Sequence, residues 1–365
     1  MIDFRYHLVS IVAVFLALAI GIVLGSTELQ GHTIDALNAA SNSLRSQLNA
    51  ANAARDGYQS QAGASEQFLQ GAEPKLVGGL LAGDNLVIIT EPGAQGSVVD
   101  GIKQAAQIAG ANVTGEVALQ PKFFDLSGAT QSSLSSINGS IAGTDGTVLD
   151  AVANPQTGYQ QQAAQLIATA ILHTTATTAT LSPPGAQALL SEYAQAGYLN
   201  ISGTPTDGNT LAVIITPQNA PADGANDPAN QVLLAVAQEF ATASGATLVA
   251  GSTTGSAQSG SAMSVLRSSG VSSAVSSVDN ADATLGQITV IEALAVQLAG
   301  GKPNSYGISG ASAVSPVSVP SATVSPSTSP STSPSASASA SASASQSPHP
   351  KTTATGKGGK LVSRK

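Results

Sequence analysis

A run of 18 uncharged, mostly apolar residues, LVSIVAVFLALAIGIVLG, fills positions 8–25. This length is close to the minimum for a helix that crosses the hydrocarbon core of a bilayer. Arg5 precedes the run and two acids, Glu28 and Asp35, follow it, so the positive-inside bias places the short N-terminus in the cytoplasm and the main domain outside it. The pattern predicts a single-pass transmembrane anchor over residues 1–28. The alternative is a cleaved signal peptide, but such peptides usually have a shorter apolar run, and no A-x-A site follows here.

Small side chains recur every four residues along this predicted helix. They are Ala13, Ala17, Gly21 and Gly25, and the last pair forms a GxxxG motif. Small residues on one face let two helix backbones approach closely in lipid, which favours helix association. We therefore expect a homo-oligomer that associates through this face. The alternative is that the stripe reflects only how common alanine and glycine are in this chain.

Residues 29–74 predict a helical stalk that continues the anchor outward. One heptad position holds Leu37, Leu44, Ala51 and Tyr58, and the other holds Ser41, Leu48, Arg55 and Ala62. About half of this seam is apolar, so the stalk is a candidate for a coiled coil that would support an oligomer. A lone solvated linker helix is the alternative.

From Lys75 onward, short apolar runs alternate with longer helical patterns. Residues 86–90 read as a buried strand and residues 112–119 as a second strand. Between them lies a helix over residues 98–109, with Ser97 in position to cap it. This order predicts a β-α-β unit with parallel strands.

A similar unit follows later in the chain. Residues 211–216 and 247–251 read as strands, and the helix between them begins at Asp227-Pro228, a capping residue followed by proline at the first helical position. The segment VIIT occurs in the first strand of each unit, which hints at two α/β halves. Further helices are expected over residues 160–173, 186–196 and 285–298. The fold class is therefore α/β, with a mostly parallel sheet over residues 75–310.

Loops at the carboxyl ends of parallel strands usually form the ligand crevice of such a sheet. Here these loops span residues 91–96, 217–226 and 252–260. Candidate crevice residues are Glu91, Gly93 and Gly96 in the first loop, together with the compact acidic pair Asp279 and Asp282. The alternatives are ordinary connecting loops and, for Asp282, capping of the helix that begins near residue 285.

The composition changes again over residues 311–365, which are rich in serine, alanine and proline. Such a segment buries too little apolar surface to fold, so we expect a disordered tail. Its last 15 residues carry five basic side chains, which could touch anionic lipid or could simply solubilise the end. The whole chain has 13 basic and 21 acidic residues. This acidic excess does not predict the basic surface that nucleic-acid-binding proteins use.

The residues that carry most enzyme and metal chemistry are scarce. The sequence has no cysteine, four histidines and two methionines, and no two histidines stand three or four residues apart. It also lacks the GxSxG, HExxH and phosphate-loop motifs in a suitable context. We therefore expect no enzyme and no resident cofactor, and the residues assign no metal ligand.

Two segments resemble a known family. The start, MIDFRYHLVS, and the stretch SSVDNADATLGQITVIEALAVQLAGGKPNSYG over residues 276–307 are similar to the mycobacterial copper transport protein B family. The resemblance implies a cell-envelope protein of copper homeostasis, acting in copper efflux or as a channel, with copper as the transported ion. Members are also described as associated with the outer membrane. The alternative function is a non-catalytic scaffold that binds an envelope protein partner controlling cell-wall assembly or division.

Overall fold

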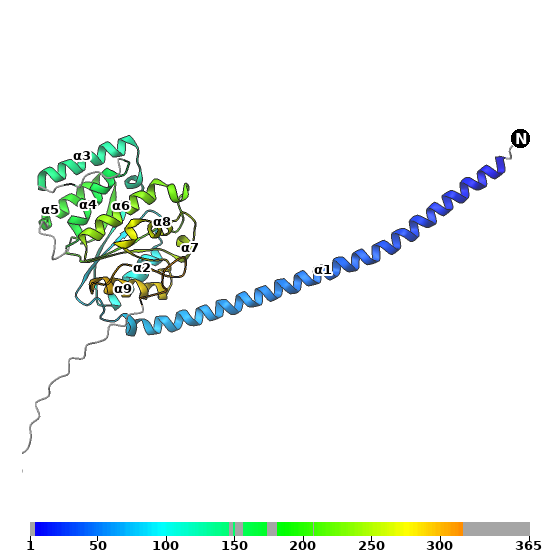
Figure 1. Ribbon diagram of the computed structural model, residues 1–365, viewed down its shortest axis with the longest axis horizontal. Coiled ribbons are helices and arrows are strands. Elements are labelled where there is room, and N and C mark those ends of the chain that lie inside the picture. The colour runs from blue at the N-terminus through cyan, green and yellow to red at the C-terminus, as the bar shows by residue number, and fades with distance from the viewer. Residues whose placement is uncertain (1–3, 146–148, 150–155, 174–180, 207, 317–365) are drawn as a thin grey trace, which may run out of the picture. The chain divides into compact units, whose positions relative to one another are not determined.

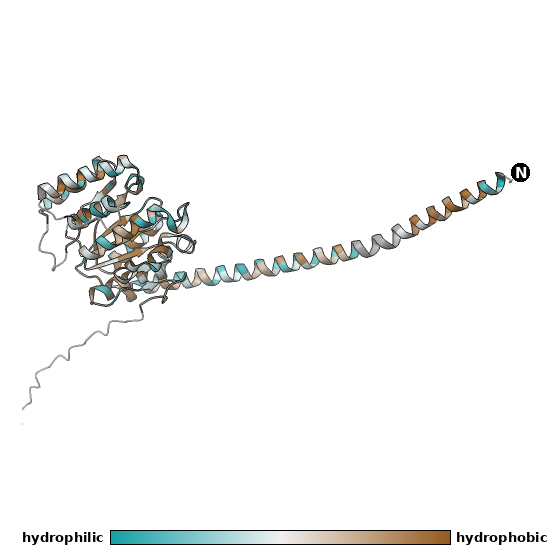
Figure 2. Ribbon diagram, turned by 45° about the horizontal axis from the view of Figure 1, so that its top comes forward, coloured by the Kyte–Doolittle hydropathy of each residue, from teal (hydrophilic) through white to brown (hydrophobic). Residues whose placement is uncertain are grey.

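The computed structural model describes residues 4–145, 149, 156–173, 181–206 and 208–316. The expected anchor and stalk form one continuous helix, α1 (Phe4–Val77). Its first part, Phe4–Gly25, has a mean hydropathy of 2.9 and no buried residue, and it is the one helix in the described chain long and apolar enough to cross a membrane. Figure 2 shows this apolar part in brown at the N-terminal end of α1, followed by a stalk of mixed colour. These features support a membrane anchor.

The rest of the described chain forms a seven-stranded sheet with the order β3-β2-β1-β4-β5-β6-β7. Every neighbouring pair is parallel except β2 and β3, which are antiparallel. The strands are β1 (Asn85–Thr90), β2 (Asn112–Leu119), β3 (Leu199–Gly203), β4 (Leu211–Ile215), β5 (Ala246–Ala250), β6 (Ser276–Val278) and β7 (Ser305–Tyr306). The predicted fold class, a mostly parallel α/β domain behind a helical anchor and stalk, is confirmed.

Helices cover both faces of this sheet (Figure 1). The α-helices are α2 (Gly96–Ile108), α3 (Gly128–Asp145), α4 (Gly158–Ile171), α5 (Pro183–Gln195), α6 (Pro228–Ala243), α7 (Thr253–Ser256), α8 (Ala262–Ser268) and α9 (Thr284–Leu298). The 3-10 helices are η1 (Pro121–Phe124), η2 (Gly224–Asn226) and η3 (Gly270–Ser273).

The central strands are apolar on both faces, as strands between two helical layers must be. In β1, Val87 and Ile89 face one core while Leu86 and Ile88 face the other, and all four are fully buried. The alternation follows from the two-residue period of a strand. This is why residues 86–90 read as a continuous apolar run.

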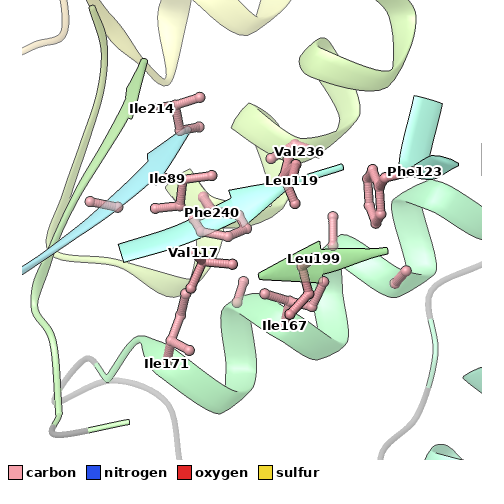
Figure 3. Packing of buried hydrophobic residues seen from close by; sticks show 14 of the residues in the cluster. Ile89, Val117, Leu119, Phe123, Ile167, Ile171, Leu199, Ile214, Val236 and Phe240 are labelled. Carbon is pink, nitrogen blue, oxygen red and sulfur yellow. The ribbon is translucent and has the colours of Figure 1, made fainter. Parts of the chain in front are cut away.

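The larger core lies between the sheet and helices α3 to α6, with α8 at its edge, and we call it the α4/α6 core. Figure 3 shows Ile89, Val117 and Ile214 of the sheet packed near Ile167 of α4 and Phe240 of α6. The opposite face, the α2/α9 core, is built from apolar side chains of α2 and α9. The sheet therefore separates two cores.

The two β-α-β units leave the centre of the sheet in opposite directions. From β1 the chain crosses to β2 through α2, in the α2/α9 core, and from β4 it crosses to β5 through α6, in the α4/α6 core. The two VIIT segments lie side by side, since β1 pairs with β4 from Leu86↔Leu211 to Thr90↔Ile215. The predicted pair of β-α-β units is thus present, joined back to back at the middle of the sheet.

The end of α1 packs against α9 and α2. Val77 is fully buried in the α2/α9 core. Glu66 accepts hydrogen bonds from the backbone nitrogen (3.1 Å) and the hydroxyl of Thr284, at the start of α9. Glu73, one heptad further along, is also buried, and its burial and the nearby Glu66 charge raise its pKa. The residue at the capping position of α9, Ala283, forms no side-chain cap. Glu66 of the stalk therefore caps this helix instead.

Two predicted details differ from the structure. Ser97 does not cap α2, because the helix begins at Gly96, two residues before the predicted start. The capping position is taken by Gln95, which forms no side-chain hydrogen bond there. Sequence reasoning also gave no element for α3 and no antiparallel edge strand β3. The α3 segment is rich in serine and glycine, although Leu134, Ile137 and Ile141 stand at helical spacing, and β3 has only two large apolar residues, Leu199 and Ile201.

Replacing Phe240 by alanine tests the α4/α6 core. Phe240 is 1% exposed, so Phe240→Ala should lower the free energy of unfolding by about 3–5 kcal/mol through lost apolar contacts and a residual cavity. Urea unfolding of the full chain in detergent micelles, followed by circular dichroism, measures this loss. Phe68→Ala is the control, since Phe68 is 73% exposed and its loss should cost under about 0.5 kcal/mol. Equal losses in the two variants would contradict the described core.

Candidate functional site

The carboxyl ends of β1 and β4 lie next to each other where the direction of winding reverses. In a doubly wound sheet this switch point leaves a crevice, because the two following loops depart to opposite faces. The β1 loop contains the sequence-predicted Glu91, Gly93 and Gly96. The loop after β4 begins at Pro217. The predicted loops 91–96 and 217–226 therefore do meet at one crevice.

Backbone hydrogen bonds tie these two loops together. The nitrogen of Glu91 donates to the carbonyl of Ile215 (3.0 Å), and the nitrogen of Gln218 donates to the carbonyl of Gly93 (3.0 Å). Gly93 has a φ of 88°, a left-handed conformation that glycine adopts without the steric cost of a side chain. Gly93 thus shapes the crevice wall through its backbone. Gly96 is the first residue of α2.

The third predicted loop, residues 252–260, is fastened to the second. The side chain of Gln258 donates to the carbonyl of Gln218 (3.1 Å) and accepts from the nitrogen of Ala220 (3.0 Å). A Cβ at Gly255 would lie 2.7 Å from the carbonyl oxygen of Gln218, so this close approach needs glycine. The crevice rim is accordingly a bonded set of loops.

A cavity of about 270 Å³ opens between these loops. Its walls are mostly five-membered proline rings and one phenyl ring, with a few polar side chains. The lining residues are Glu91, Pro92, Pro121, Phe124, Pro217, Asn219, Pro221, Ala229, Asn230 and Ala262. The wall formed by Pro121 and Phe124 was not predicted from the sequence, although both lie within five residues after the predicted strand over residues 112–119.

Glu91 is the ionisable side chain in this lining. It is 6% exposed, and burial raises the pKa of its carboxyl to about 8, because a low-dielectric surrounding disfavours the charged form. No hydrogen bond to this carboxyl is formed by the described residues. At neutral pH the crevice therefore holds a largely uncharged carboxylic acid to which the described residues offer no partner.

A second, more polar hollow of about 230 Å³ lies on the other side of Glu91. It is lined by Thr90, Glu91, Ala94, Gly96, Val99, Asp100, Lys103 and Glu116. Lys103 Nζ donates to Glu116 Oε2 (2.9 Å), and Thr90 Oγ1 donates to Glu116 Oε1 (3.3 Å). The positive charge of Lys103 is thus compensated by Glu116 rather than by Glu91.

Asp279 lies in a different environment. Its side chain is fully buried and pairs with Arg267 Nη1 at 2.8 Å, and it accepts from the nitrogens of Ile308 (2.7 Å) and Ser309 (2.9 Å). Arg267 also donates to the carbonyl of Tyr306 (2.7 Å). The bonds to Tyr306, Ile308 and Ser309 hold the segment around β7 on the sheet, and the ion pair joins α8 to the end of β6. Asp279 therefore has a structural role.

Asp282 does not cap the helix near residue 285, which corrects the expected role. Its Oδ1 accepts from the nitrogen and the hydroxyl of Thr253, both at 2.8 Å, at the start of α7. Glu66 bonds Thr284 instead. Asp279 and Asp282 follow β6, which is three strand spacings, about 14 Å, from β1. The structure therefore does not gather the five candidate crevice residues around one point.

The small-residue stripe Ala13, Ala17, Gly21 and Gly25 lies on the exposed surface of α1. A Cβ at Gly21 or Gly25 would meet nothing within 4 Å. Every residue of Phe4–Gly25 is exposed in the same way, so helix association through this stripe stays a prediction.

Among the residues that the structure describes, no group of three or more histidine, aspartate or glutamate side chains could hold a metal ion. The tail with its basic end, from residue 317 on, lies outside the described residues.

An apolar N-terminal helix joined to a doubly wound domain defines a membrane-anchored α/β protein. Residues 1–316 match the family described as "Copper transport outer membrane protein, MctB", and the chain belongs to this family. "Copper transporter MctB" of Mycobacterium tuberculosis (strain ATCC 25618 / H37Rv) is 29% identical over 312 residues, covering 84% of this chain and 96% of the relative. The protein of the same name from Mycobacterium leprae (strain TN) is 28% identical over 317 residues, with the same coverage. These relatives carry transporter names rather than enzyme names, and the family resemblance expected from the sequence is confirmed.

The variant Glu91→Gln tests the state of the buried carboxyl. Below about pH 4.5 the folded and unfolded states both hold the proton, but between about pH 4.5 and 8 only the folded state keeps it. Stability of the wild type relative to Glu91→Gln should therefore fall as pH rises through this window and level off above it. The fall is at most about 5 kcal/mol, since each tenfold change in proton affinity corresponds to about 1.4 kcal/mol. Urea unfolding from pH 4 to 9 measures the difference, and a difference independent of pH would contradict a buried neutral acid.

Proposed function

We propose that this protein acts in copper efflux from the cell, with copper as the transported ion. The observation that carries the proposal is the extent of the family match, because residues 1–316 include the anchor, the stalk and the whole α/β domain. The relatives named as copper transporters also align along nearly their full length. Copper is the cargo in this proposal, and no resident metal is assigned.

The proposed topology has the N-terminus in the cytoplasm and the α/β domain on the outer side of the membrane. Arg5 stands on the N-terminal side of the apolar segment and Asp35 on the other, and basic residues favour the cytoplasmic side. In a two-membrane envelope this orientation lets the stalk carry the domain away from the anchoring bilayer. Copper would then be handled outside the cytoplasm.

A transport role for a single-helix protein requires several copies. One helix cannot enclose a path for an ion, because a path needs walls on all sides. The stalk offers a face for assembly: Leu37, Leu44 and Leu48 are 60–70% exposed along one side of α1. Together with Ala40, Ser41 and Arg45 they line a shallow groove on this helix. A second copy of α1 would cover these leucines in a coiled coil, and the small residues of the anchor could continue the contact in lipid.

Cysteine cross-linking tests this assembly cleanly, because the chain has no cysteine of its own. Leu44→Cys should give a disulfide-linked dimer of the full chain in membranes under mild oxidation. Ser46→Cys is the matched control, since position 46 lies about 200° around the helix from position 44. The measurement is the dimer fraction on a non-reducing gel. Equal cross-linking at the two positions, or none at position 44, would rule out the Leu37/Leu44/Leu48 face as the contact.

Copper content tests the function itself. A strain that lacks the protein should accumulate copper under copper load, because an export route is missing, and complementation should restore the normal content. Total cellular copper is measured by elemental mass spectrometry, with zinc and iron as internal comparisons. A normal copper content and normal copper tolerance in the deletion strain would overturn the efflux proposal.

The second candidate is a non-catalytic scaffold for an envelope protein that controls cell-wall assembly or division. The single anchor helix in the described chain favours it, because one helix is enough to tether a binding domain. Cross-linked purification of the full chain from membranes would distinguish the two. Recovery of one stoichiometric envelope protein, with unchanged copper in the deletion strain, supports the scaffold; recovery of the chain alone counts against it.

A further inference from the structure

The cavity at the switch point is not used by the proposed copper function. We propose that it binds a small organic molecule that carries a primary ammonium group on an apolar body. The ammonium group would sit at Glu91 and the apolar body between the proline rings and Phe124. This inference rests on the cavity and its lining, independently of the family match.

The position and the rigidity of the cavity favour a binding role. It lies where the β1 and β4 loops separate, which is the usual ligand position in doubly wound sheets. Its rim is held by the bonds Gln218 to Gly93 and Gln258 to Gln218. A site that is already formed loses less entropy when a ligand binds. A volume of about 270 Å³ is at the low end of small-molecule sites, so a ring with a short side chain fits better than a nucleotide.

The walls select an apolar body. Four prolines, Pro92, Pro121, Pro217 and Pro221, and Phe124 surround the space. Rings of this kind offer apolar surface at little cost in side-chain entropy, because proline has no free rotamers and phenylalanine has few. A flat ring or a short aliphatic chain would pack between them.

The polar groups that line the cavity favour a ligand that donates hydrogen bonds. The Glu91 carboxyl has no partner among the described residues and, once ionised, offers acceptor oxygens. The amide nitrogen of Asn230 is already used, since it donates to the carbonyls of Gly224 (2.9 Å) and Gly260 (3.1 Å). What Asn230 has left is an acceptor oxygen. Asn219, the third polar side chain of the lining, offers both a donor and an acceptor. Acceptors therefore outnumber donors once Glu91 is ionised, and a group with several donors matches them best.

The charged residues in and around the cavity favour a cationic ligand. No basic residue is among those that line the cavity, and Lys103 in the adjoining hollow pairs with Glu116. A bound ammonium group would favour the ionised form of Glu91, which then releases its proton to solvent, and the two charges would share a charge-assisted hydrogen bond. An anionic ligand would meet the acid of Glu91 and the amide oxygen of Asn230, with the Asn219 amide as its one side-chain donor in the lining, so the cavity fits an anion less well than a cation.

Benzylamine is the probe for this site, with benzyl alcohol as its neutral analogue of the same shape. Saturation-transfer NMR and calorimetric titration of the full chain in detergent micelles should show saturable binding of benzylamine. Binding of benzyl alcohol should be at least about tenfold weaker, since it lacks the charged donor. No saturable binding of benzylamine at millimolar concentration would overturn the proposal.

Three variants locate the binding. Glu91→Gln should weaken benzylamine binding about tenfold or more and should reduce the preference for benzylamine over benzyl alcohol. Ala229→Leu should abolish binding of both probes by filling the cavity, with the carboxyl intact. Asp100→Asn is the control: Asp100 is an exposed acid in the adjoining hollow, and its change should leave binding unaltered. Full binding by Glu91→Gln, or loss in Asp100→Asn alone, would place the probe elsewhere and refute the proposal.

Discussion

The pairing of β1 with β4 at the centre of the sheet is the constraint on which the rest of this structure depends. Five residues of each strand run side by side, from Leu86↔Leu211 to Thr90↔Ile215, and both strands are buried on both faces. Because their crossovers pass through α2 on one face and α6 on the other, the two following loops must separate. The crevice is therefore a consequence of how the sheet is wound, and the chain fills its entrance with proline rings rather than with bulky flexible side chains.

Buried acids in this protein divide according to whether the chain supplies a partner. Asp279 is paired with Arg267 and bonded by two backbone amides, so its burial is compensated and it fastens the sheet edge. The half-buried Glu66 caps α9 and joins the stalk to the domain. Glu91 is buried without such compensation from the described residues, which costs stability unless a ligand or a proton offsets it. Glu73 is likewise buried with one oxygen unpartnered, but it lies on the stalk, whereas Glu91 lines the switch-point cavity and can reach a ligand there.

Much of the fold could be predicted from local patterns. The strands over residues 86–90 and 112–119 were visible because apolar runs between two helical layers are continuous, and Asp227-Pro228 marked the start of α6 because the cap and the proline act within one turn. The edge strand β3 could not be predicted, since a short edge strand carries few apolar residues. The role of Asp282 depends on Thr253, 29 residues away, and the cap of α9 comes from Glu66, 218 residues away. Such contacts are set by the packing of distant segments.

Of the candidate site, the loop with Glu91 was predicted from its position after a strand. The opposite wall, with Phe124, was not predicted.

The titration of the Glu91 carboxyl in the folded chain tests most directly whether this acid is buried and unpaired in the switch-point crevice. Carbon-13 NMR of the full chain labelled at glutamate side-chain carboxyls, with Glu91→Gln to assign the signal, follows each acid from pH 4 to 10. We predict that the signal lost in Glu91→Gln titrates near pH 8, because the carboxyl lies buried and unpaired in the crevice. A midpoint near 4.5, the ordinary value for glutamate, would mean that the carboxyl is solvated or paired, and would contradict the crevice as described.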